Sequence, residues 1–280
     1  MSELRKRMIE DMQLHGYAQS TQNAYLGTVK SLARHYDRPP DQLSEEQIRA
    51  FFLNLINDKQ IASSTLTIYL CGIKFFYEST LKRQWPIFGL IHPTTRKKMP
   101  VILALEEVRH LLSRVRRPVA RMCLTMIYSC GLRPSEGAHL QVDDIDSQRM
   151  MVRIRNGKRG KDRYVPLPQR TLKRLRDYWL LERPRPWLFP STDPQSPIIL
   201  RTLQRTMKRT LRECGIRKQA TVHTLRHCYA THLLEAGVDL RTIQDLLGHR
   251  SLTTTFRYAH LTRKSIEKLN ATLNHLMADL

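Results

Sequence analysis

The sequence lacks the features that mark several classes of protein. Its five cysteines are an odd number without a CxxC pair, which argues against a disulfide framework or a zinc site and predicts reduced thiols in a cytoplasmic protein. No charge-free apolar run approaches the roughly 18 residues that a membrane span needs. The first residues, MSELRKR, have no apolar core of the kind found in a signal peptide. We therefore expect a protein with no membrane segment and no metal ligands.

Acidic residues are scarce relative to basic ones. The 280 residues include 25 Asp and Glu against 47 Lys and Arg, which gives a net charge of +22 and a sequence pI near 10.3. Of the basic residues, 33 are arginine, whose planar guanidinium binds phosphate through two parallel hydrogen bonds. A hydrophobic content of 41% is enough for a folded core. The balance of charge predicts a polyanionic partner.

The positive charge is unevenly distributed along the chain, which indicates two domains. Residues 1–95 carry a net charge of +2, whereas residues 96–280 carry +20. Between these parts, residues 84–100 contain three prolines, one glycine and a basic cluster, a composition typical of an extended linker. We predict a domain over 1–83, a linker over 84–100 and a second domain over 101–280.

The first domain is expected to be helical. Apolar residues recur at helical spacing over 3–14, 21–36, 44–56 and 63–77. The third of these segments begins with Ser44-Glu45-Glu46-Gln47, the pattern of a capping box. The sequence leaves open whether this domain only packs or also docks into a DNA groove.

The second domain combines helices with a small sheet. Strands are expected over 150–154 and 163–167, joined by a hairpin turn at Asn156-Gly157. Helical spacing is found at 105–115, 119–130, 169–182, 200–214, 222–236, 240–247 and 263–278. The fold is therefore predicted to be mainly α with one small antiparallel β-sheet.

The predicted hairpin is strongly basic, because residues 153–176 carry a net charge of +9. A solvated basic face and a contact with a DNA backbone both explain such a run, and the charge density favours DNA. The loop Gly157–Lys161 lacks the GxxxxGK[ST] pattern, so we reject a nucleotide-binding P-loop. The residues expected to bind DNA are Lys97, Lys98, Arg155, Arg159, Lys161 and Arg163.

Other segments hold residues that can carry chemistry. His223 and His227 have the spacing of a metal-binding pair, but Thr224 stands where a zinc protease would have glutamate. His223 and Arg226 instead place an imidazole beside a fixed cation on one helix face. Arg133 lies in a turn after a predicted helix, where Pro134 can begin the next one. Taken singly, each of these signals is weak.

Together these segments resemble the tyrosine recombinase (phage integrase) family, most closely its Xer-like, phage and transposon-borne members. The matching motifs are Gly-Leu-Arg-Pro-Ser-Glu at 131–136, the basic hairpin loop at 157–163, His-x-x-Arg at 223–226 and Leu-Gly-His at 247–249. Pro134 and Gly137 depart modestly from the family pattern. The resemblance assigns catalytic roles to Arg133, Lys158, His223, Arg226, His249 and the nucleophile Tyr258, with Glu136 as a supporting carboxylate and Lys161 as the alternative lysine.

The resemblance implies cleavage of DNA without a cofactor or metal. Tyr258 would attack a phosphodiester, giving a 3′-phosphotyrosyl intermediate and a free 5′-hydroxyl. Arg133, Arg226 and His249 would stabilise the pentacoordinate phosphorane. His223 would help to deprotonate Tyr258, and Lys158 would protonate the departing 5′-oxygen.

The resemblance also implies an architecture. A SAM-like core-binding domain and the catalytic domain would clamp double-stranded DNA, and the helix over 263–278 would dock into a neighbouring protomer of a DNA-bound homo-tetramer. The competing interpretation is that this helix folds back on its own domain. Two other functions stay open at this point: a type IB topoisomerase-like enzyme, and a non-catalytic DNA-binding architectural protein. Integration, excision and resolution of DNA are all compatible with the motifs.

Overall fold

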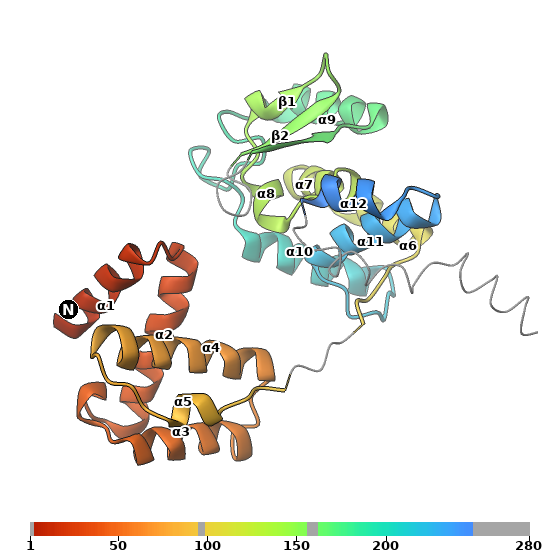
Figure 1. Cartoon of the computed structure of the whole chain (residues 1–280). Coiled ribbons are helices and arrows are strands. Elements are labelled where there is room, and N and C mark those ends of the chain that lie inside the picture. Colours follow the sequence, from red (N-terminus) through yellow and green to blue (C-terminus); the bar gives the residue numbers. More distant parts are fainter. Residues whose placement is uncertain (1–2, 95–98, 156–161, 249–280) are drawn as a thin grey trace, which may run out of the picture. The chain divides into compact units, whose positions relative to one another are not determined.

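The computed structural model describes residues 3–94, 99–155 and 162–248, divided into two compact units at Met1–Lys98 and Met99–Leu280 (Figure 1). We call these units the N-terminal domain and, after the activity predicted for it from the sequence, the catalytic domain. Several predicted residues lie outside the described ranges, as does the helix predicted over 263–278. These residues are Lys97, Lys98, Lys158, Arg159, Lys161, His249 and Tyr258.

The N-terminal domain is built from helices. They are α1 (Glu3–Leu14), α2 (Gln19–Tyr36), a 3₁₀ turn at Pro40–Gln42, α3 (Glu45–Asn57), α4 (Ser63–Phe75), a π-helical turn at Phe76–Thr80 and α5 (Ile87–Leu90). The predicted capping box is present at the start of α3, where Gln47 N donates to Ser44 Oγ and Ser44 N donates to Gln47 Oε1. These two bonds satisfy amides that a helix N-terminus otherwise leaves unpaired.

The close packing of α2 against α4 requires a glycine. A Cβ on Gly72 would lie 2.3 Å from Thr28 Oγ1 and 3.0 Å from the Tyr25 Cα. Because these are neighbouring backbone and side-chain atoms of α2, a larger residue would force the helices apart. The buried side chains of Phe51, Phe52 and Phe76 fill the core beside this crossing.

The segment proposed as a linker, 84–100, is part of the N-terminal core over its first residues. Trp85 lies 4.4 Å from Tyr77 between ring centroids, and Ile87 and Phe88 of α5 are buried. The backbone amide of Ile87 also donates to Glu45 Oε1 at 2.9 Å. Helix α5 was not expected, because Pro86 and Gly89 indicate a turn more strongly than four residues can indicate a helix.

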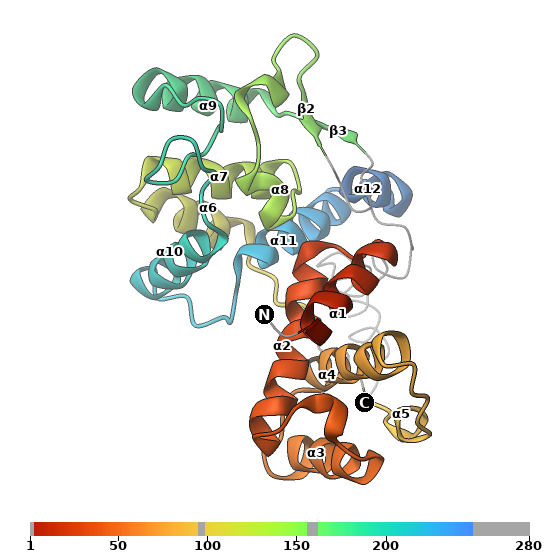
Figure 2. The same cartoon turned by 90° about the vertical axis from the view of Figure 1, so that its left-hand side faces the viewer.

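The catalytic domain surrounds helix α7 (Pro118–Ser129), which buries most of its length, including Cys123, Leu124 and Met126. The other helices are α6 (Leu105–Arg114), α8 (Pro134–Ala138), α9 (Gln169–Glu182), α10 (Leu200–Glu213), α11 (Val222–Glu235) and α12 (Leu240–Leu247). Helix α7 packs against α6, α8, α9, α10 and α11, and α12 packs against α11; Figures 1 and 2 show the sheet and α9 at one end of this domain.

The sheet of the catalytic domain is small and antiparallel, in the order β1–β2–β3. Its strands are β1 (Ile145–Asp146), β2 (Met151–Ile154) and β3 (Arg163–Pro166). In the β2–β3 pair, Ile154 stands opposite Arg163 and Val152 opposite Val165. The prediction of a mainly α fold with one small antiparallel sheet is confirmed, whereas β1 and the 3₁₀ turn before it were not expected. Among the described helices, none is long and apolar enough to cross a membrane.

The packing of α5 predicts a specific effect of substitution. Phe88 is 4% exposed and Leu90, in the same helix, is 67% exposed. We expect Phe88→Ala to lower the free energy of unfolding of the N-terminal domain by about 3–5 kcal/mol, because it leaves a cavity. Hydrogen exchange of full-length protein, resolved by peptide, measures the effect on each domain. Leu90→Ala is the matched control and should change little. Equal, small effects of both substitutions would show that α5 is not part of the core.

Candidate active site

Arg133 and Glu136 form the first part of the site at the start of α8. Arg133 precedes this helix, and Pro134 occupies its first position, where the missing amide of proline costs nothing. The backbone N of Arg133 donates to Glu136 Oε2 at 2.8 Å, and its Nη1 donates to Oε1 at 2.7 Å. One carboxylate therefore fixes both the backbone and the guanidinium of Arg133.

The turn that delivers Arg133 depends on Gly131. This residue has φ +62°, and a Cβ there would lie 2.5 Å from two ring carbons of Tyr229. A side chain is excluded both by this contact and by the left-handed backbone conformation. The carbonyl oxygen of Gly131 then accepts a hydrogen bond from Arg226 Nη1 at 2.7 Å. The same turn thus positions both arginines.

Arg226 is a buried cation, only 2% exposed, in the second turn of α11. Its Nη2 donates to the carbonyl of Leu247 at 2.5 Å, so it joins the ends of α7 and α12 through two backbone oxygens. The carboxyl ends of helices carry partial negative charge, which favours a guanidinium there. Arg226 Nη1 also lies 3.8 Å from Glu136 Oε2. The two predicted arginine motifs are therefore brought together around one carboxylate.

Glu136 is the carboxylate at the centre of this cluster, and its side chain is 8% exposed. Burial by itself raises the pKa of a carboxyl group, but hydrogen bonds from Arg163 and Arg133 and the charge of Arg163 outweigh it. Together they lower the pKa of Glu136 to about 2. The group is therefore ionised at neutral pH and serves as an acceptor of hydrogen bonds.

His223 stands beside the arginines on α11 and keeps access to solvent. Partial burial, followed by the charges of Arg226 and Arg133, lowers the pKa of His223 against a smaller opposing effect of Glu136. The imidazole is thus held neutral near pH 7 and is able to accept a proton. Its ring packs edge-on against His227, with centroids 4.7 Å apart. In the described part of the chain, no group of three His, Cys, Asp or Glu residues is placed to hold a metal.

The basic residues of the sheet occupy two different settings. Arg155 Nε donates to Asp144 Oδ1 at 2.5 Å while its side chain stays 36% exposed. Arg163 instead points into the domain, where Nη1 and Nη2 each donate to an oxygen of Glu136 at 2.8 Å. Sequence reasoning missed this contact. Counting the strand alternation from the apolar Val165 would have placed Arg163 on the inward face.

Helix α12 ends at the site with Gly248, which has φ +61°. Its carbonyl oxygen accepts from Arg133 Nη2 at 3.3 Å. His249 follows directly in the sequence, and its structure and that of Tyr258 lie outside the described residues. Of the predicted catalytic residues, the structure brings Arg133, His223 and Arg226 together with Glu136.

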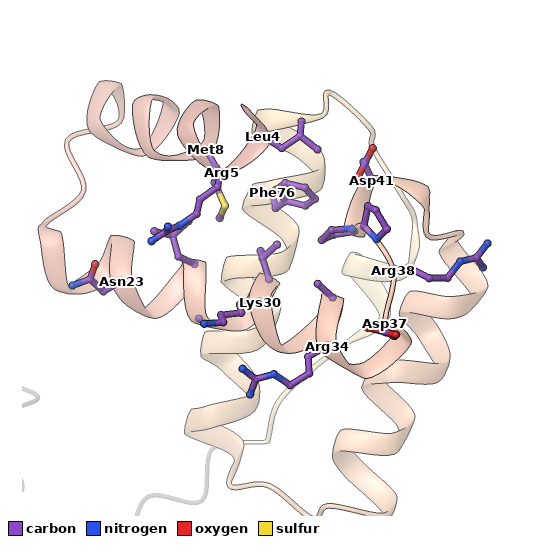
Figure 3. Close-up of a pocket in the computed structure, with 16 residues that line it drawn as sticks. Leu4, Arg5, Met8, Asn23, Lys30, Arg34, Asp37, Arg38, Asp41 and Phe76 are labelled. Atoms are coloured by element: carbon purple, nitrogen blue, oxygen red, sulfur yellow. The ribbon is translucent and has the colours of Figure 1, made fainter. Parts of the chain in front are cut away.

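The N-terminal domain contains a separate pocket of about 900 Å³. Figure 3 shows it between α1 and α2 and the segment that follows α2, with Phe76 and Met8 among its lining residues. Four basic side chains contribute to its lining: Arg5, Lys30, Arg34 and Arg38. Two carboxylates, Asp37 and Asp41, also line it, and none of the residues predicted to be catalytic does.

Comparison with protein families shows the family of the chain. Residues 102–265 match the phage integrase family, and residues 4–87 match the phage integrase N-terminal SAM-like domain. A putative integrase/recombinase of Sinorhizobium fredii is 44% identical over 97% of this chain and 88% of its own length. An integrase/recombinase of Escherichia coli is 34% identical over 94% of this chain and 89% of its own length. The chain belongs to the phage integrase family.

Solved structures share the fold. The crystal structure of XerA recombinase is 27% identical, with a TM-score of 0.56, and the match covers 96% of this chain and 97% of that one. A lambda integrase dimer bound to a core site has a TM-score of 0.73 at 17% identity, covering 91% of this chain and 75% of that one. The family relationships identify the chain as a tyrosine-type site-specific DNA recombinase, and they do not favour the topoisomerase-like or non-catalytic alternatives.

The burial of Glu136 predicts a pH-dependent contribution to stability. Its pKa falls from an ordinary 4.5 to about 2 on folding, so the ionised carboxylate stabilises the fold above about pH 4.5. The contribution, about 3 kcal/mol in full, is lost as the pH falls from 4.5 toward 2. Glu136→Gln should therefore lower the free energy of unfolding at pH 7, and its difference from wild type should shrink across that window.

Urea unfolding at a series of pH values measures this difference. The exposed Glu106, in the first turn of α6, provides the matched control. Glu106→Gln should change the free energy of unfolding by no more than about 1 kcal/mol. A constant difference between wild type and Glu136→Gln at all pH values would contradict the assigned role of the carboxylate.

Proposed function

We propose that this recombinase cleaves and rejoins double-stranded DNA through Tyr258, with Arg133 and Arg226 binding the scissile phosphate. The observation that carries the proposal is the buried cluster in which Glu136 and backbone carbonyls hold both arginines in place. Guanidinium groups fixed before the substrate arrives stabilise developing charge without reorganising during the reaction. His249 and Tyr258 follow this cluster in the sequence and complete the set of proposed catalytic residues.

The proposed reaction proceeds in two reversible transfers. The phenolic oxygen of Tyr258 forms a bond to the scissile phosphorus as the bond from phosphorus to the 5′-oxygen breaks. The proton of Tyr258 passes toward His223, whose neutral imidazole is suited to receive it. Lys158, or alternatively Lys161, supplies a proton to the departing 5′-oxygen. The 5′-hydroxyl of a partner strand then attacks the phosphotyrosine and restores the backbone.

Related structures solved on DNA support DNA as the partner. XerH recombinase has been solved with its difH substrate before and after cleavage, and lambda integrase as a dimer on a core site. For this chain we propose that the basic catalytic domain follows the DNA backbone. The proposed contacts are those predicted from the sequence at Lys97, Lys98, Arg155, Arg159 and Lys161.

Assembly on DNA is proposed to involve more than one protomer. Apolar residues recur at helical spacing through 263–278, a pattern that needs an apolar partner surface. We propose that this helix docks into a neighbouring protomer, giving a homo-tetramer on two DNA sites. Whether the outcome is integration, excision or resolution is set by the arrangement of those sites.

A nicked suicide substrate tests the proposed nucleophile. Binding sites are first selected from a pool of random DNA duplexes, and nicked duplexes are then made from the selected sequence. Cleavage beside the nick releases a short strand, so the covalent protein–DNA intermediate accumulates. We expect wild type to form an adduct stable in SDS and Tyr258→Phe to form none, because the attacking oxygen is missing.

Tyr164→Phe is the matched control, since it removes one hydroxyl from an exposed tyrosine of β3. This variant should form the adduct as wild type does. An adduct that persists in Tyr258→Phe would place the nucleophile elsewhere. A selected duplex that is bound but never cleaved by wild type would favour a non-catalytic DNA-binding protein.

A further inference from the structure

Arg163 faces the interior of the catalytic domain, unlike its neighbours on β3. It shares the inward face with the fully buried Val165 and stands opposite Ile154 of β2. Tyr164, on the other face of the strand, is 56% exposed. A charged side chain on an inward face costs free energy unless it is paired. Its orientation therefore indicates a partner inside the domain.

The partner of Arg163 is Glu136. Both terminal nitrogens of Arg163 bind the two carboxylate oxygens at 2.8 Å, and the Arg163 side chain is only 15% exposed. This bidentate arrangement is the strongest form of an arginine–carboxylate pair. While Glu136 holds these two parallel N–H groups, a DNA phosphate cannot take the same pair in a bidentate contact. The geometry therefore favours an internal role over the DNA contact expected from the sequence.

Arg163 also touches the end of α12. A Cβ on Gly248 would lie 3.2 Å from Arg163 Cδ and 3.3 Å from its Nε. The side chain of Arg163 thus lies against the residue whose carbonyl accepts from Arg133. Three elements of the site meet at this one side chain: β3, the start of α8 and the end of α12.

Glu136 has more donors than Arg133 alone supplies. Its Oε1 accepts from Arg133 Nη1 and Arg163 Nη1, and its Oε2 accepts from the Arg133 backbone and Arg163 Nη2. Arg226 Nη1 is only 3.8 Å from Oε2. If Arg163 is removed, the carboxylate is free to turn toward Arg226. That movement would alter both of the arginines proposed to bind the phosphate.

We infer that Arg163 is a positioning residue, which holds the Glu136 carboxylate and, through it, the guanidinium of Arg133 in the arrangement that DNA cleavage requires. The inference rests on the proposed function of this site. It gives Arg163 an effect on the rate of cleavage although the side chain does not face the phosphate. Such supporting contacts typically change activity by about 10–100-fold when removed.

The first test separates cleavage from DNA binding. Arg163→Met is compared with Arg153→Met, which removes the same charge from the other face of the sheet, where Arg153 pairs with Asp162 at 3.5 Å. Affinity for a selected duplex and single-turnover cleavage of a saturated nicked duplex are measured for each variant. We expect Arg163→Met to slow cleavage of bound DNA about 10–100-fold with affinity within about threefold of wild type.

Arg153→Met is expected to affect affinity at most, with cleavage of saturated DNA near wild type. Arg163→Lys should be intermediate, because an ammonium keeps the charge but not the bidentate bonds. Weakened affinity with normal cleavage of saturated DNA in Arg163→Met would overturn the inference and make Arg163 a DNA contact. If wild type itself forms no adduct, the proposed function fails instead, so the two failures are distinguishable.

A double-mutant cycle and a pH profile exclude a merely structural role. If Arg163 acts through Glu136, the double variant Glu136→Gln/Arg163→Met should cleave no more slowly than the slower single variant. This double variant also removes both charges of the Arg163–Glu136 pair, so neither charge is left buried without the other. Multiplicative losses in the double variant would overturn the inference.

The pH profile depends on the groups that face Glu136. These are Arg133 at α8, Arg163 on β3, and Arg226 and His223 on α11. Loss of Arg163 removes the largest of the influences that lower the pKa of Glu136, while burial continues to raise it. We expect cleavage by Arg163→Met to fall at a higher pH on the acid side than cleavage by wild type. Identical acid limbs would contradict the inference.

Discussion

A single buried carboxylate, Glu136, holds the catalytic domain's functional arginines in place. It accepts hydrogen bonds from Arg133 and Arg163 and lies near Arg226. Since one negative charge faces three positive ones, the cluster keeps an excess of positive charge inside the protein. Such an excess is costly in an empty site, and under the proposed function an anionic phosphodiester would offset it. The same arrangement would then limit stability and favour catalysis.

The backbone groups around Glu136 belong to the ends of helices rather than to their interiors. The turn after α7, the start of α8 and the last residues of α12 supply backbone carbonyls and amides that hold the arginines. Gly131 and Gly248 make this possible, because both adopt positive φ and a Cβ on Gly131 would also clash with the ring of Tyr229. Of the residues proposed to be catalytic, Arg133 is thus carried on a short turn, and the backbone at such helix ends holds Arg226 of α11 in place.

Much of the fold and part of the candidate site could be predicted from the sequence. Helical spacing and the Asn156-Gly157 turn gave the fold class, because apolar periodicity reflects which face is buried. The motifs around Arg133 and Arg226 identified residues that the structure brings together. Short elements such as α5 were not predicted, since four residues span little more than one helical turn and show no repeat of the pattern. The pairing of Arg163 with Glu136 was not predicted because a basic residue in a basic hairpin is ordinarily solvated. The alternation from Val165 places Arg163 on the inward face, but only the three-dimensional fold shows which carboxylate it meets there. The roles of Tyr258 and His249 stay predictions, because both residues lie outside the described ranges.

We expect the arginine cluster to be organised before DNA binds. Nitrogen NMR of arginine guanidinium groups in the DNA-free protein tests it most directly, with Arg163→Lys and Arg226→Lys used to assign the signals. Exposed guanidinium groups rotate and exchange rapidly, whereas buried, hydrogen-bonded ones do not. We predict slowly exchanging, rotationally hindered signals for Arg163 and Arg226 at neutral pH without DNA. Signals that become hindered only after DNA is added would contradict the claim.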